Sequence, residues 1–452
     1  MIEDLANDGA EFVNELLKEV RSIKDEKRWK EVMTPRNKLK LGNFIYNTQT
    51  GIMSFNNTSW ELEMKATLDQ TLQNEIIKNI KDKGAYVEFR KKIANRRNIP
   101  ETQVDFWLLT LTGRILSDSV GKESTWVSVY PLLQMFLNDV IDGPMEWRIT
   151  AYLSGITMNV EAIQLEKDVV LRQPKAFDAE KLLGDSFTFT GNMMYFHTVS
   201  AVLQIETTQK EQPMISPTAN VYALILLLFR TGSVNIVKTF WKGNSLTRAL
   251  GEMSGGPSLI PFPIEKYTID KEDEDKLIRF AERIKSKLPI DQKNGMLITD
   301  SYTGISIARY QDAILKNEDV INRISYAVMG LEALFLKSVE NGELSMRLSQ
   351  RVSKLINAIT GDSIFEIFDA MENAYQIRSN FVHGSIQGKP TSESKLILSK
   401  VLSYLRTSIV VFLSIENKDK DQIINLIDHS ILDHKVDNKL LEMLSNYLEM
   451  VH

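Results

Sequence analysis

Apolar residues recur every three or four positions through much of the chain, a spacing typical of amphipathic helices. In the first third it predicts helices over residues 4–23, 68–83 and 104–117. After residue 264 it predicts helices over 271–287, 303–315 and 319–337. Two further helices follow. The apolar seam of the first is Leu344, Leu348, Val352, Leu355 and Ile359, and that of the second is Leu398, Val401, Leu405, Ile409, Phe412 and Leu413. Amphipathic helices joined by short loops predict a helical bundle. The polar, helical tail over 419–452 is expected to pack outside it.

The pattern changes in the middle of the chain, where β-branched and aromatic residues predominate. Segments of this kind predict strands over 147–158, 169–172, 187–190, 200–207 and 221–229. Thr231, Gly232 and Ser233 are expected to form a hairpin turn into a further strand over 234–241. We therefore predict an α+β protein with a β-rich middle module, which serves either as a sensor or protein-contact surface or as a scaffold packed on the bundle.

Glycines and prolines in GEMSGGPSLIPFP, residues 251–263, break any regular element and predict a linker. No lysine-serine or lysine-threonine pair follows them, which argues against a phosphate-binding loop. The predicted organisation is a helical N-terminal region over 1–140, a β-rich module over 141–250, a linker over 251–264, and a helical bundle with its tail over 265–452.

Composition narrows the classes of function. The 452 residues include no cysteine, which excludes disulfides, thiolate metal sites and a cysteine nucleophile. The start of the chain is acidic and amphipathic, unlike a signal peptide, and the longest apolar run, 221–229, is too short to span a bilayer. We therefore expect a cytoplasmic protein with no membrane partner. The net charge of −5 provides no general attraction for nucleic acid, so RNA binding must be local. The most basic run, RKKIANRR at 90–97, is interpreted as a solvated face or loop in preference to a phosphate-binding patch.

One helix, predicted over 362–384, carries the candidate chemistry. Asp362 and Ser363 are candidate N-caps, Ser363 with Glu366 forms a candidate capping box, and Gly384 marks the end. Two apolar stripes predict burial of much of its girth: Ile364, Phe368, Met371 and Tyr375, and Ile367, Ala370, Ala374, Ile377 and Phe381.

Arg378 and His383 are the candidate catalytic residues of this helix. Arg378 continues the first apolar stripe, so its permanent charge needs a partner or a cleft. His383 lies five residues on, about 140° round an ideal helix. Either the helix frays at 380–382, or a second copy of the chain completes the site. The dipole at a helix C-terminus favours the imidazolium, as suits a histidine that acts as an acid.

Glu332 places a carboxylate on the core face of the helix over 319–337. A buried carboxylate requires a cation, which Arg347, Arg351 or Arg378 could supply. We interpret Glu332 as a structural ion-pair partner in preference to a catalytic base.

The residues Arg378-Ser379-Asn380-Phe381-Val382-His383 resemble the R-x4-H motif of HEPN domains, all-helical bundles whose catalytic members are ribonucleases. The upstream segments RISYAVMGLEALFLK, residues 323–337, and ELSMRLSQRVSKL, residues 343–355, are similar to the Apea-like HEPN subgroup in order and spacing. The resemblance covers residues 300–416. Asn380 is one position later than the polar residue of many active members, which have Asn, Asp or His where this chain has Ser379.

The resemblance implies a metal-independent endoribonuclease that uses the 2′-hydroxyl of the RNA to cleave the RNA. It also implies a homodimer through the R-x4-H helix. His383 would transfer protons, Arg378 would hold the scissile phosphate, and Asn380 and Glu332 would be supporting residues. No cofactor or metal is implied, and we interpret His429 and His434 as solvated residues. In one hypothesis the bundle is a defence or toxin-like effector whose N-terminal or β-rich part binds a protein trigger. The alternative is a catalytically inert HEPN module for dimerisation or binding.

Overall fold

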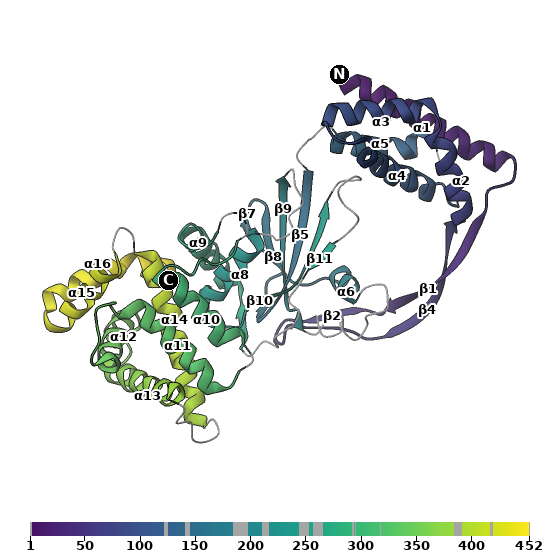
Figure 1. Cartoon of the computed structure of the whole chain (residues 1–452). Helices are drawn as coiled ribbons and strands as arrows, with labels where there is room; N and C mark the ends of the chain where they lie inside the picture. The colour runs from purple at the N-terminus through teal and green to yellow at the C-terminus, as the bar shows by residue number, and fades with distance from the viewer. Residues whose placement is uncertain are drawn as a thin grey trace.

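The computed structural model has the predicted α+β architecture (Figure 1). It describes residues 2–121, 125–140, 145–183, 198–209, 217–243, 253–255, 265–291, 293, 295–316, 318–383, 391–415 and 419–451.

The N-terminal helices form a unit with its own hydrophobic core. They are α1 (Ile2–Asp25), α2 (Gln70–Lys81), α3 (Gly84–Arg97), α4 (Glu101–Asp118) and α5 (Trp126–Val140). The three helices predicted here are confirmed as α1, α2 and α4. The basic run lies at the end of α3, where Arg90 pairs with Glu101 and Asp105 and Lys92 pairs with Asp8. These ion pairs agree with a solvated helical face.

A long antiparallel ribbon interrupts the region predicted to be helical. Its strands are β1 (Glu31–Leu41) and β4 (Thr58–Leu68), and its tip carries a hairpin of β2 (Phe44–Asn47) and β3 (Ile52–Phe55). Figure 1 shows the ribbon bridging the N-terminal helices and the central sheet. The prediction of a helical region over 1–140 is therefore wrong for this stretch. Alternation of apolar and charged residues in β4 is a strand pattern.

The middle of the chain is organised around a six-stranded antiparallel sheet of order β11-β10-β5-β9-β8-β7. Its strands are β5 (Met145–Ser154), β7 (Ala162–Glu166), β8 (Val169–Arg172), β9 (Ala201–Gln209), β10 (Asn235–Gly243) and β11 (Met253–Gly255). One face packs against α8 (Pro217–Phe229). The other packs against the β2–β3 hairpin and α6 (Ala176–Leu183).

Two local predictions in this module are corrected. Residues 221–229, predicted as a strand, lie in α8, because a continuous apolar run is compatible with a helix buried on nearly every side. Thr231, Gly232 and Ser233 consequently connect this helix to β10 and do not form a hairpin turn. The strand predicted over 187–190 lies outside the described residues.

The C-terminal part is helical, as predicted. Its elements are the 3₁₀ helix η1 (Lys271–Asp273), α9 (Glu274–Lys285), α10 (Tyr302–Leu315), α11 (Val320–Phe335), α12 (Leu344–Thr360), α13 (Ile364–Val382), α14 (Ser392–Ser414), α15 (Lys420–Leu432) and α16 (His434–Val451). The predicted seam of α12 is confirmed at Leu348, Val352 and Leu355, which are fully buried.

The predicted linker over 251–264 does not separate two cores. Its described part forms β11, and β12 (Tyr267–Ile269) pairs in parallel with β6 (Ile156–Met158). One hydrophobic core extends from the sheet through α8 and α9 to α16. Arg406 of α14 reinforces this contact by donating to the carbonyl oxygens of Leu228 and Phe229, at 2.9 and 3.1 Å. The β-rich module and the bundle are therefore parts of one packed body.

Among the described helices, α14 alone is long and apolar enough to cross a membrane by length and composition. However, 72% of its most apolar window is buried within the protein. That burial is compatible with the core helix of a soluble protein.

Candidate functional site

The helix α13 carries the R-x4-H residues. Ser363 is its N-cap, as predicted, but the Ser363 side chain makes no capping hydrogen bond, so the capping box is absent. At the other end His383 is the cap residue, and Gly384 lies outside the described residues. The helix is regular through Val382, so the fraying considered for residues 380–382 does not occur.

Only one face of α13 is deeply buried. Ile367, Ala370, Met371 and Ala374 are buried, whereas Ile364 is exposed. The stripe that begins at Ile367 is therefore buried over much of its length, as predicted. The prediction of burial is wrong for Ile364, where the other stripe begins. The reason is tertiary, because α11, α12 and α14 pack on the helix and leave its other side open.

Arg378 is bound by Glu332 of α11. Arg378 Nη2 lies 3.3 Å from Glu332 Oε2, and the two side chains are 25% and 18% exposed. The expected ion pair of Glu332 is thus present, with Arg378 as its partner. Burial raises the pKa of the Glu332 carboxyl, and the positive charge of Arg378 opposes that rise.

Tyr375 completes the surroundings of this guanidinium, and sequence reasoning did not identify it as part of the site. The guanidinium carbon of Arg378 lies 5.8 Å from the centroid of the Tyr375 ring, within the range of a cation–π contact. Arg378 Nε is buried without a hydrogen-bond partner. The sequence signal was the spacing of three residues, which places both side chains on one side of a helix.

His383 is exposed at the last turn of α13. Its backbone N–H donates to the carbonyl oxygen of Ser379 at 3.1 Å, which closes the helix. Because α13 is regular, His383 lies about 140° round the axis from Arg378. The two candidate catalytic side chains of one chain therefore point to different sides.

Asn380 is also exposed and accepts a hydrogen bond from Gln376 Nε2 at 2.9 Å. Two positions after Arg378, it lies about 160° round the helix from that residue. The structure thus brings Glu332 and Arg378 together and leaves Asn380 and His383 apart from them.

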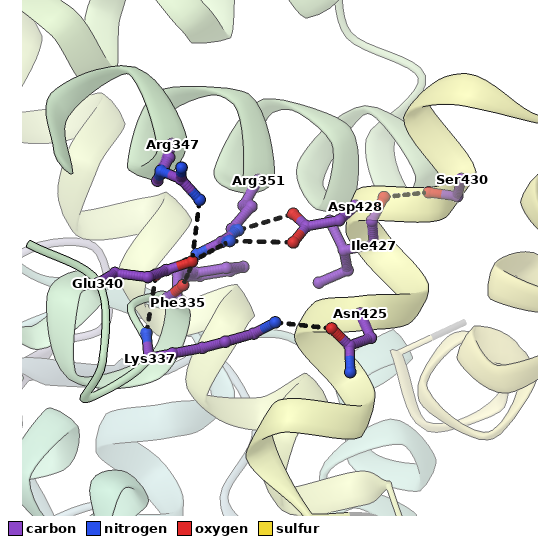
Figure 2. A network of polar contacts seen from close by, with 9 residues as sticks. All are labelled: Phe335, Lys337, Glu340, Arg347, Arg351, Asn425, Ile427, Asp428 and Ser430. Carbon is purple, nitrogen blue, oxygen red and sulfur yellow. Dashed lines mark hydrogen bonds and ion pairs between the residues drawn. The ribbon is translucent and has the colours of Figure 1, made fainter. Parts of the chain in front are cut away.

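Arg347 and Arg351, the other candidate partners of Glu332, belong to a separate network (Figure 2). Arg351 is 3% exposed and binds Glu340 through Nη2 and Nη1 at 2.6 and 2.8 Å. It also donates from Nε and Nη2 to Asp428 at 2.7 and 2.9 Å, and from Nη1 to the Phe335 carbonyl oxygen. Arg347 reaches the same Glu340 at 3.2 Å. This network fastens α15 and the segment after α11 to α12.

The charge state of this network is firmly fixed. The hydrogen bond from Arg351 is the largest cause that lowers the pKa of Glu340 to about 2. Glu340 therefore remains ionised at physiological pH, as expected for a structural ion pair. Sequence reasoning missed the network because Asp428 is 77 positions from Arg351.

No group of three or more His, Asp or Glu side chains with metal-binding geometry occurs among the described residues. His429 is exposed on α15, next to the Asp428 that binds Arg351.

Comparisons with known proteins provide no relative: no family model, curated protein or solved structure matches this chain. A guanidinium with a displaceable carboxylate partner can bind a phosphodiester, and an exposed imidazole can transfer a proton at neutral pH. One chain does not bring these two groups to the same small target.

Proposed function

We propose that this protein is a metal-independent endoribonuclease of the HEPN type. The 2′-hydroxyl of the RNA would attack the adjacent phosphorus, forming a P–O2′ bond and breaking the P–O5′ bond. The products would be a 2′,3′-cyclic phosphate and a 5′-hydroxyl. His383 would take the proton of the 2′-hydroxyl or give one to the leaving 5′-oxygen, and Arg378 would stabilise the added negative charge.

The observation that carries this proposal is the state of Arg378. The Arg378 side chain is 25% exposed and makes one ion-pair contact, at 3.3 Å, so the guanidinium retains N–H donors for a phosphate. Its surroundings strengthen that interaction, because partial burial lowers the effective dielectric constant. Glu332 would support the site by holding Arg378 in place before RNA arrives, and the scissile phosphate would then displace the Glu332 carboxylate from the guanidinium.

A homodimer through α13 would reconcile the separation of Arg378 and His383. The exposed side of α13 carries Glu366, Asp369 and Glu372 in the first half and His383 in the second, whereas Arg378 lies on the side that faces α11. Two copies packed antiparallel across a two-fold axis would place His383 of each chain against the acidic first half of the other. In that arrangement His383 of each chain approaches the other chain. Asn380, which is also exposed on α13, has access to RNA.

The biological role we favour is that of a cytoplasmic defence or toxin-like effector. The N-terminal helices, the ribbon and the sheet would bind a protein trigger. Contact between the sheet and the bundle through one shared core supports this role, because a change at the sheet has a direct mechanical route to α14.

The alternative is an inert HEPN module for dimerisation or binding, and one observation favours it. Arg378 is already paired with Glu332, and a structural pair needs no substrate.

RNA cleavage in EDTA by the purified protein and by its His383→Ala variant distinguishes these functions. We expect cleavage by the wild-type protein and a loss of about 10²- to 10⁴-fold in the variant, the range that acid–base assistance contributes. The matched control is His429→Ala, which removes another exposed histidine. Equal cleavage by His383→Ala and His429→Ala would reject the R-x4-H site as the source of the activity, and no cleavage by the wild type under any trigger would favour the inert module.

A further inference from the structure

The Arg378 guanidinium has two neighbours of different chemistry, Glu332 and Tyr375. Glu332 of α11 accepts a hydrogen bond from Arg378 Nη2 at 3.3 Å. The Tyr375 ring, one helical turn before Arg378 on α13, has its centroid 5.8 Å from the guanidinium carbon. A cation–π contact attracts the charge of the guanidinium and needs no oxygen acceptor. Tyr375 therefore does not compete with a phosphate for the N–H donors of Arg378, whereas Glu332 does.

Tyr375 is a firm support for this contact. Its side chain is partly buried and packs against the hydrophobic core that includes Met371 and Ala374 of the same helix. Burial raises the pKa of the Tyr375 hydroxyl, and the negative charge of Glu332 raises it further. The phenol is therefore neutral at physiological pH, and packing within the chain sets the position of the ring.

Glu332 cannot hold Arg378 once a phosphate is bound. Among the described residues it is the one hydrogen-bond partner of the guanidinium, and Arg378 Nε is buried without a partner. In the reaction proposed above, the scissile phosphate displaces the Glu332 carboxylate. Of the two neighbours, Tyr375 alone can then keep its contact with Arg378.

We propose that Tyr375 is a positioning residue, which holds Arg378 against the scissile phosphate after Glu332 has been displaced. The inference rests on the proposed function and adds to it a division of labour between the two neighbours of Arg378. Glu332 holds the guanidinium in the free protein and opposes RNA binding, whereas Tyr375 supports RNA binding. Removing the two side chains should therefore change RNA affinity in opposite directions.

The first test is fluorescence anisotropy with a single-stranded RNA in the His383→Ala background, which prevents cleavage. Tyr375→Leu removes the ring and keeps an apolar side chain against the core, so it should weaken binding about two- to fivefold, the range of an exposed cation–π contact. Tyr375→Phe keeps the ring and should restore most of the affinity. Phe365→Leu is the matched control, because it removes a ring that is 77% exposed on the same helix. Tyr375→Met provides a second variant if Tyr375→Leu misfolds.

The Arg378→Met background shows whether Tyr375 acts through Arg378. There Tyr375→Leu should have no further effect on RNA affinity, since the guanidinium that it positions is gone. An equal loss in both backgrounds would mean that the ring contacts RNA directly and would overturn the proposal. Unchanged affinity in Tyr375→Leu, or the same loss in Tyr375→Phe, would overturn it as well.

Urea unfolding without RNA tests the Tyr375–Arg378 contact independently of the nuclease. A double-mutant cycle of Tyr375→Leu and Arg378→Met should show coupling of about two- to fivefold in the unfolding equilibrium constant. RNA binding by the wild type without this coupling would overturn the role of Tyr375 and leave the proposed function standing. Coupling in a protein that neither binds nor cleaves RNA would reject the proposed function, and the positioning role with it.

Discussion

The guanidinium of Arg378 lies 3.3 Å from the carboxylate of Glu332, 46 positions earlier in the chain. The contact joins α13 to α11 and gives a half-buried carboxylate its cation. Because Arg378 is also the candidate phosphate ligand, this pair decides whether the site is catalytic or structural. Its two roles have different consequences for stability and for RNA binding, which mutation can separate.

Replacing Arg378 by alanine should destabilise the protein by about 1–2 kcal/mol at neutral pH. The value is below the roughly 3–5 kcal/mol of a fully buried pair because both side chains retain some exposure. Burial raises the pKa of Glu332 in the folded state, so its ionisation costs stability above that pKa and the cost disappears as the pH falls. Losing the Arg378 charge raises this pKa further. Urea melts should therefore show a larger deficit at pH 7.5 than at pH 5.

The control for that experiment is Arg347→Ala, whose arginine is 44% exposed in its pair with Glu340. It should cost less than about 1 kcal/mol. A deficit for Arg378→Ala that does not change between the two pH values would show that Glu332 is not its partner.

Glu332→Gln should tighten RNA binding. In the free protein the Glu332 carboxylate competes with a phosphate for Arg378, and glutamine keeps a hydrogen-bond acceptor without the negative charge. We expect affinity for a single-stranded RNA to rise about three- to tenfold, by fluorescence anisotropy in a His383→Ala background that prevents cleavage.

Glu372→Gln is the matched control, since it removes one exposed carboxylate from the same helix that carries Arg378. If both variants tighten binding equally, the effect is one of general charge and not of competition at Arg378. Unchanged affinity in Glu332→Gln would argue that RNA does not contact Arg378.

Glu340→Gln should lower the free energy of unfolding by about 2–3 kcal/mol while leaving RNA cleavage intact. The mutation removes the carboxylate that Arg351 binds most closely and leaves Asp428 to pair with the buried guanidinium. Because the folded pKa of Glu340 is depressed to about 2, its stabilisation is present above about pH 4.5 and is lost as the pH falls toward 2. Thermal melts from pH 7 to pH 2 should show the two proteins converging, and exposed Glu343→Gln should follow the wild type throughout.

Truncation should reveal the shared core. A fragment over 265–452 would expose the surfaces of α9 and α14 that pack against the sheet module, so we expect it to be aggregated or molten. A fragment over 145–452 keeps that core and should melt cooperatively. Calorimetry and near-ultraviolet circular dichroism of both fragments test this expectation. A cooperative melt of the shorter fragment would restore the boundary that the glycines and prolines predicted.

The sequence by itself determined the amphipathic helices of the C-terminal part, because helical periodicity is a local property. The apolar seam of α12 and the regular course of α13 follow from spacings of three and four residues. It also determined that Arg378 and His383 lie on different sides of one helix, since a regular helix turns by about 100° per residue. The need of Glu332 for a cation could be predicted from its place on an apolar stripe, although three arginines were candidates.

Tertiary structure decided that Arg378 is the cation that pairs with Glu332. Arg351 is bound by Glu340 and Asp428, two residues that lie far apart in the sequence. It also decided that residues 221–229 form a helix, since an apolar run alone carries no period and the sheet above it supplies the packing surface. Likewise, composition marked 251–264 as a linker, but hydrogen bonding of β11 to β10 and of β12 to β6 placed its ends within the sheet module. Such choices depend on which distant surfaces meet, and only long-range packing determines that.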